Sequence, residues 1–162
     1  MCSSDLFDVD SVGLTNVITR LNHGLDIGGQ SIGMPTAFHV GVRVNPGAED
    51  LDAEVRRFEY KVEAGAEFAM TRPVFDALTF ERFFRRIESL HLPLLVGLWP
   101  FESVIDAEFM ANEVPGIRVP VQILERMRGT RDQDEASAQG IAIARETLAA
   151  VRTMVQGDSL RG

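Results

Sequence analysis

Short apolar segments alternate with amphipathic helical patterns along this chain, and that alternation restricts the fold more than any other feature. Apolar runs lie at residues 37–44, 68–71 and 94–98, and a minimal run lies at 114–120 between two prolines. Helical periodicity predicts helices at residues 12–22, 50–64, about 80–87 and 103–112, and a long last helix capped near Asp132 or Asp134. Strands that are apolar on both faces, alternating with such helices, predict an α/β fold with a parallel sheet covered by helices.

The spacing of apolar residues also predicts which side of each helix faces the core. Positions three and four apart lie on the same face of a helix. The predicted core-facing sets are Leu51, Val55, Phe58 and Val62; Phe80, Phe83, Phe84 and Ile87; and Ile141, Ala144, Leu148, Val151 and Val155.

Chain length narrows the α/β alternatives. A closed barrel of eight β/α units takes about 250 residues, whereas this chain has 162 and supports about four units. A small doubly wound sheet fits the length by itself, but no G-x-G-x-x-G pattern follows a strand, so the dinucleotide fingerprint of that fold is absent.

Charge and cysteine content exclude several classes of function. The formal net charge is -8 and the basic residues are spread along the chain, which argues against nucleic acid or an anionic membrane as partner. The single cysteine, Cys2, allows no disulfide within the chain. No apolar stretch approaches the roughly 18 residues of a membrane span, so we expect a soluble, cytoplasmic protein.

Residues 1–6 are set apart from the remainder. They have no periodicity and join abruptly to a strand-like start at Phe7. One reverse translation of residues 2–6 closely matches a common sequencing adapter. Our hypothesis is a non-native segment at 1–6, with a short disordered terminus as the alternative, followed by a single domain at 7–162.

Polar residues followed by proline mark the ends of three predicted strands. They are Arg43 to Pro46, Thr71-Arg72-Pro73 and Trp99-Pro100. Ligands of parallel α/β folds bind at the carboxyl ends of the strands, so these residues would form one binding rim. Ordinary turn chemistry, in which proline ends a strand because it has no N–H, explains each of them equally well.

A second candidate is a polar stripe on the helix that follows Asn45. Glu54, Arg57 and Lys61 lie beside the apolar face of this helix rather than opposite it. A solvated ion-pair surface is the simpler reading. Alternatively, Lys61 could hydrogen-bond a carbonyl or phosphate of a ligand lying over the rim.

Other chemistry finds little support in the sequence. His23, His39 and His91 are scattered without the spacing of metal ligands, so no metal site is expected. Asp8 and Asp10 could act as paired carboxylates, but alternation at a strand end accounts for them equally well. No G-x-S-x-G or P-loop pattern occurs.

Several distinctive segments follow one another in order and cover nearly the whole chain. They are FDVDSVGL at 7–14, NHGLD at 22–26, GMPT at 33–36, VNP at 44–46, KVEAGA at 61–66, TRPVFD at 71–76, NEVPG at 112–116 and ERM at 125–127. No single segment is decisive, but the ordered series is specific. It resembles the methylenetetrahydrofolate reductase family, and is closest to the form fused behind a homocysteine methyltransferase.

The resemblance implies a partial (β/α)8 barrel whose N-terminal strands and last unit lie outside this chain. It implies a flavoprotein that reduces 5,10-methylenetetrahydrofolate to 5-methyltetrahydrofolate with FAD and NADH or NADPH. By the same resemblance, Lys61 and Glu54 match flavin-binding positions of the family, and Asn45 and Ala48 fall in a loop that approaches the cofactor.

Two departures from the family pattern stand out. Arg72 occupies the position of a family glutamine that contacts the nicotinamide donor and folate, and arginine cannot accept a hydrogen bond. The family's general-acid glutamate lies upstream of Phe7.

The first hypothesis is therefore a fragment of a reductase that is active only within a longer enzyme. That enzyme could form a homo-oligomer or carry a fused methyltransferase domain. A non-catalytic α/β binding module is the second, and another phosphate- or pterin-binding barrel the third.

Overall fold

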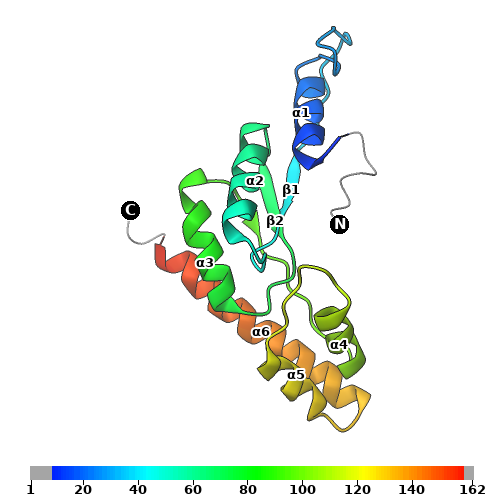
Figure 1. Cartoon of the computed structure of the whole chain (residues 1–162), viewed down its shortest axis with the longest axis vertical. Coiled ribbons are helices and arrows are strands. Elements are labelled where there is room, and N and C mark those ends of the chain that lie inside the picture. Colours follow the sequence, from blue (N-terminus) through cyan, green and yellow to red (C-terminus); the bar gives the residue numbers. More distant parts are fainter. Residues whose placement is uncertain (1–8, 159–162) are drawn as a thin grey trace.

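The computed structural model describes residues 9–158 (Figure 1). Within this range lies a parallel sheet with the strand order β1-β2-β3, formed by Gly41–Val44, Phe68–Thr71 and Leu94–Leu95. Arg43 pairs with Met70, and Met70 pairs with Leu95. The expected parallel α/β arrangement is confirmed, whereas the hypothesis on residues 1–6 falls outside the described residues.

The first and third strands are shorter than predicted. Residues 37–39 do not join the sheet. Backbone groups of Phe38 and Val40 form hydrogen bonds with the side chains of Asn22 and Glu67 instead of with a neighbouring strand. After Leu95, the amide of Gly97 donates to the hydroxyl of Thr71 at 2.9 Å, so a side chain replaces the backbone ladder.

The prediction of a fourth strand at residues 114–120 is wrong. This segment is an irregular loop, which we call the 113–120 loop. Pro115 and Pro120 have no N–H to donate to a ladder, and Gly116 adopts a positive φ of 73°.

Two helices cover one face of the sheet. α2 (Leu51–Glu63) and α3 (Ala77–Ile87) begin where the carboxylates of Asp50 and Asp76 accept hydrogen bonds from backbone amides of the first turn. Their apolar sides bury one cluster against β1 and β2, which confirms most of the predicted core-facing residues. The buried members are Val44, Val55, Phe58, Ala69, Phe83 and Ile87.

The opposite face of the sheet is not covered by any described segment. Arg43, Met70 and Leu95 project from this face and are exposed. Since side chains alternate along a strand, this open face and the buried one belong to the same three strands.

Three more helices follow the sheet: α4 (Val104–Asn112), α5 (Val121–Arg128) and α6 (Gln133–Asp158), whereas the short 3-10 turn Glu88–Leu90 continues α3 ahead of β3. α6 begins at the predicted cap, where Asp132 Oδ1 accepts from the amide of Glu135 at 2.9 Å. α5 was not predicted from the sequence, and its eight residues bury only Ile123 and Met127.

The buried side of α6 agrees with the predicted one at Val151 and differs from it at Ile141 and Leu148. Ile143, Thr147 and Val151 are buried, together with Ala136 and Gly140, whereas Ile141 and Leu148 are exposed. Gly140 decides this orientation, because a Cβ there would lie 1.9 Å from the carbonyl oxygen of Phe101. The helix can approach the Phe101 backbone only along a side that carries glycine.

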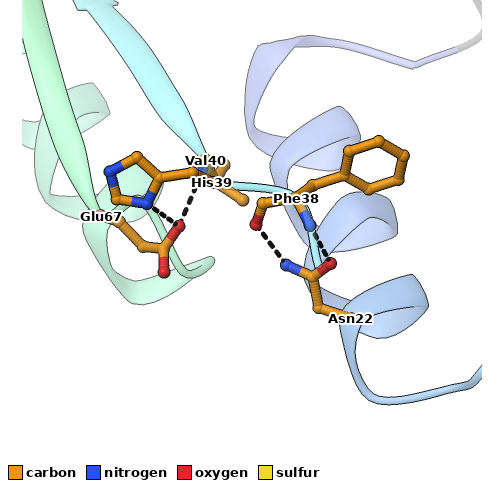
Figure 2. A network of polar contacts seen from close by, with 5 residues as sticks. All are labelled: Asn22, Phe38, His39, Val40 and Glu67. Carbon is orange, nitrogen blue, oxygen red and sulfur yellow. Dashed lines mark hydrogen bonds and ion pairs between the residues drawn. The ribbon is translucent and has the colours of Figure 1, made fainter. Parts of the chain in front are cut away.

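α1 (Ser11–Asn22) lies at the other end of the molecule from α4 and α5 (Figure 1). Asp10 is the N-cap of α1 and accepts from the Gly13 amide at 2.8 Å, so its role in the structure is helix capping. Figure 2 shows how Asn22, at the end of α1, accepts from Phe38 N at 2.9 Å and donates to Phe38 O at 2.7 Å. Asn22 therefore forms the hydrogen bonds to the Phe38 backbone that a neighbouring strand would otherwise form.

Glu67 continues this polar network on the other side of the segment that leads into β1 (Figure 2). Its Oε2 accepts from Val40 N at 2.6 Å and lies 2.8 Å from His39 Nδ1. These bonds lower the pKa of the Glu67 carboxyl, with the Val40 amide as the largest cause.

Candidate functional site at the carboxyl ends of the strands

The carboxyl ends of β1 and β2 and the segment that follows β3 meet around one cavity of about 320 Å³, which we call the inner cavity. Residues from each of the three predicted rim segments line it, so the structure brings the rim together. The lining residues are Arg43, Thr71, Arg72, Pro73, Trp99, Asp106, Phe109, Met110, Val114 and Ile117. This volume is within the range of small-molecule pockets.

A second cavity of about 420 Å³, the outer cavity, lies on the other side of the 113–120 loop. The turn after β1 and the start of α3 form much of its wall. Its lining includes Asn45, Pro46, Gly47, Phe75, Asp76, Gly116 and Ile117. Pro73 and Ile117 line both cavities, so the two cavities are adjacent, and the 113–120 loop contributes a partition between them.

Two rim side chains hold this partition in place. Arg72 Nη1 donates to Pro115 O at 2.6 Å, and Asn45 Nδ2 donates to Gly116 O at 2.8 Å. A Cβ on Gly116 would lie 2.9 Å from Arg72 Nη1 and 3.0 Å from Asn45 Nδ2. This role of Gly116 was not predicted from the sequence, although the Pro115-Gly116 pair is a turn signal that could have identified it.

Arg72 therefore donates one hydrogen bond to the chain itself rather than to a ligand. Its guanidinium keeps further N–H groups, and it lines the inner cavity. Arg43 is exposed on the same cavity, and the structure gives its guanidinium no partner among residues 9–158. The inner cavity thus has a positively charged wall.

Lys61 and Glu54 lie at the outer edge of the sheet. Val40 and Val44 accept hydrogen bonds from the β2 side, so the carbonyl of Arg43 and the amide of Asn45 point to the unpaired edge of β1. Lys61 Nζ donates to Arg43 O at 2.7 Å, and Glu54 Oε1 accepts from Asn45 N at 2.7 Å. The two side chains thereby satisfy backbone groups that a further strand would otherwise take.

Burial changes the chemistry of Lys61. The residue is only 6% exposed, and desolvation lowers the pKa of its ammonium group below the ordinary value of 10.5. Glu54 opposes this shift and Arg57 adds to it. The predicted polar stripe is thus divided, because Glu54 and Lys61 contact β1 while Arg57 is exposed.

Asn45 and Ala48 form the tight turn after β1. Ala48 N donates to Asn45 O at 3.1 Å, and Gly47 N donates to Asn45 Oδ1 at 3.1 Å. This turn places Asn45 at the outer cavity. The sequence prediction that Asn45 belongs to the rim is therefore consistent with its position.

Two absences apply to the part of the chain that the structure describes. Residues 9–158 contain no group of three or more His, Cys, Asp and Glu side chains arranged to hold a metal ion. None of the described helices is both long enough and apolar enough to cross a membrane.

The fold and the rim define the class: an α/β protein with a cavity at the carboxyl ends of parallel strands. Comparison with known proteins then gives the family. The sequence model of the methylenetetrahydrofolate reductase family matches residues 31–159. The chain belongs to this family, as the ordered motifs predicted.

Two curated relatives agree with the family match. Methylenetetrahydrofolate reductase 1 of Schizosaccharomyces pombe is 21% identical over 89 residues, which cover 54% of this chain and 15% of the relative. Probable methylenetetrahydrofolate reductase (NADPH) of Caenorhabditis elegans is 27% identical over 94 residues, which cover 57% of this chain and 14% of the relative. The matched region is thus a small part of either relative.

Proposed function

We propose that this chain is part of an enzyme that reduces 5,10-methylenetetrahydrofolate to 5-methyltetrahydrofolate with FAD and NADH or NADPH. Membership of the family and the names of the two relatives support the reaction. The observation that carries the proposal for this chain is the inner cavity, since it gathers polar side chains from three strand ends.

We further propose that residues 7–162 supply adjacent strands of a (β/α)8 barrel, whose other strands come from elsewhere in a longer enzyme. Strand order follows chain order, and α2 and α3 pack on the same face of the sheet. A doubly wound sheet reverses its strand order and has helices on both faces, so this arrangement favours the barrel. The exposed face with Arg43 and Met70 would then line the barrel interior.

Lys61, Glu54, Asn45 and Ala48 are the proposed FAD contacts. The donor set fits the cofactor chemically, because an ammonium group suits a phosphate or carbonyl and a carboxylate suits a hydroxyl. Lys61 has two N–H bonds beyond the one given to Arg43 O, and Glu54 has a second carboxylate oxygen. Bound FAD would supply hydride transfer between the nicotinamide donor and the folate.

The folate is proposed to bind at the inner cavity, where Arg72 would interact with an anionic group of the folate or of the nicotinamide donor. A fixed positive charge suits a glutamate tail or a phosphate. The general acid is proposed to come from the part of the enzyme that precedes Phe7. A cytoplasmic location, self-association and a fused methyltransferase domain remain proposals of the same kind.

The test uses the chain joined to the coding sequence that adjoins it in its gene. Purified protein is examined for flavin absorbance and then assayed for methylenetetrahydrofolate-menadione turnover. Yellow protein with turnover is expected. Colourless, folded and inactive protein would refute the proposal.

One observation favours the non-catalytic alternative. Lys61 and Glu54 already have hydrogen-bond partners within the chain, so these polar groups are satisfied without a ligand.

A substitution tests the flavin contact. In the joined protein, Lys61→Ala should weaken FAD retention, with Arg57→Ala as the matched control on the same helix. Equal flavin content in wild type and the Lys61 variant would exclude Lys61 as a flavin contact.

A further inference from the structure

Two large aromatic side chains on the inner cavity are left half open to solvent. Trp99, the single tryptophan of the chain, is 46% exposed, and Phe109 is 56% exposed. Trp99 follows β3 and Phe109 lies on α4, so different segments bring them to the same cavity. Exposed aromatic faces beside a polar pocket are suited to stacking on a flat ring.

The orientation of the Trp99 indole is fixed by Asp106. Asp106 Oδ2 accepts from Trp99 Nε1 at 3.3 Å and from Glu102 N at 3.2 Å. Asp106 is itself held in the first turn of α4, where its amide donates to Ser103 Oγ at 3.0 Å. Because the indole is bonded through its N–H edge, its ring faces stay available for contact.

The same cavity also carries positive charge. Arg43 has an unpartnered guanidinium within residues 9–158, and Arg72 has donors beyond the one given to Pro115 O. A ligand that combines a flat conjugated ring with an anionic group would match both features.

We propose that Trp99 contacts the ligand by stacking on a conjugated heterocycle that carries an anionic tail, and that Asp106 is a positioning residue for the indole. The inference rests on the proposed function and deepens it, because it assigns the ring-binding wall of the same cavity. Both the pterin of a folate and the isoalloxazine of a flavin have this chemistry, so the test has one arm for each.

The first experiment titrates the 162-residue chain with folic acid and, separately, with FAD while recording the emission of its only tryptophan. N-acetyltryptophanamide at the same ligand concentrations corrects for absorbed light. Saturable quenching in one arm is expected, and it identifies the ligand that binds near Trp99. Absence of saturable quenching in both arms would overturn the proposal.

The second experiment measures the dissociation constant of the quenching ligand by calorimetry. Trp99→Leu is expected to raise it about tenfold, and Trp99→Phe, which keeps an aromatic face, much less. Tyr60→Leu is the matched control, since Tyr60 is 58% exposed on α2 and lines neither the inner nor the outer cavity. An unchanged constant for folded Trp99→Leu would overturn the proposal.

Positioning by Asp106 has its own readout. Asp106→Ala should lower the fluorescence anisotropy of Trp99 and weaken ligand binding, whereas Asp106→Asn keeps an acceptor oxygen and should restore both. Equal anisotropy in all three proteins would refute the positioning role. Turnover by the joined enzyme that is unaffected by Trp99→Leu would refute this inference alone, whereas ligand quenching without turnover would refute the proposed reaction alone.

Discussion

Gly140→Ala tests whether the close contact between α6 and the Phe101 backbone stabilises the structure. The added Cβ would lie 1.9 Å from the Phe101 carbonyl oxygen and 2.8 Å from its amide nitrogen. These are backbone atoms, so no side-chain rotation relieves the overlap. The segment that continues from Trp99 and the start of α4 would have to move with them.

The expected loss of stability follows from two opposing terms. Overpacking a buried contact costs about 1 to 3 kcal/mol, and the upper end applies here because backbone must shift. Replacing glycine by alanine inside a helix returns about 1 kcal/mol. The net loss in the free energy of unfolding should be about 2 kcal/mol, or a fall in Tm of roughly 4 to 8 °C.

Urea unfolding followed by circular dichroism measures this loss, and Gly13→Ala is the matched control. Gly13 also lies within a helix, and its added Cβ would meet the Val9 side chain at 2.6 Å, which can rotate away. Gly13→Ala should therefore be no less stable than wild type, with a gain of up to about 1 kcal/mol. If Gly140→Ala is as stable as wild type, the reasoning about the α6–Phe101 contact is refuted.

Two further predictions concern polar groups around β1. The pKa of Lys61 is lowered in the folded state, so the native protein loses its proton before the unfolded chain does, and the free energy of unfolding should rise as pH approaches 10.5. Urea unfolding between pH 7 and that value should show this rise in wild type and lose it in Lys61→Met; equal slopes would contradict the assignment. Asn22→Ala removes both bonds to the Phe38 backbone, and hydrogen exchange of the Phe38 amide should become about tenfold faster, with Asn16→Ala on the exposed side of α1 as control. Equal exchange in both variants would show that Asn22 does not order this segment.

Local signals were enough to predict much of the fold. The helix predicted at 50–64 is observed at Leu51–Glu63, because the apolar periodicity of this segment marks its buried side and Asp50 caps its first turn. The strand at 68–71 was predicted with its observed bounds, because a compact apolar run ends at Arg72-Pro73. These elements depend on residues close together in the sequence.

The errors arise where distant segments decide the outcome. Apolar periodicity favoured Ile141 and Leu148 for the buried side of α6, but close approach to Phe101 required the side that contains Gly140. No pattern within α6 shows that another backbone passes there. The 113–120 loop was misread for a similar reason, since Asn45 and Arg72 hold it from other parts of the chain.

The sequence predicted which residues belong to the candidate site better than it predicted the contacts between them. Strand-end positions alone indicated that Arg43, Thr71 and Trp99 share a rim, and the inner cavity contains all three. The positioning of Trp99 by Asp106 was not foreseen, because it joins a loop residue to the first turn of α4.

The contacts of Lys61 and Glu54 connect the fold to the proposed cofactor site. Both side chains satisfy backbone groups at the unpaired edge of β1, and Lys61 is buried in doing so. If β1 is an inner strand of a closed barrel, a neighbouring strand supplies the partners for the Arg43 carbonyl and the Asn45 amide. The ammonium group of Lys61 and the carboxylate of Glu54 are then released at the same edge. Barrel closure and flavin binding would thus depend on the same two side chains, so flavin affinity should increase when the adjoining strands are present.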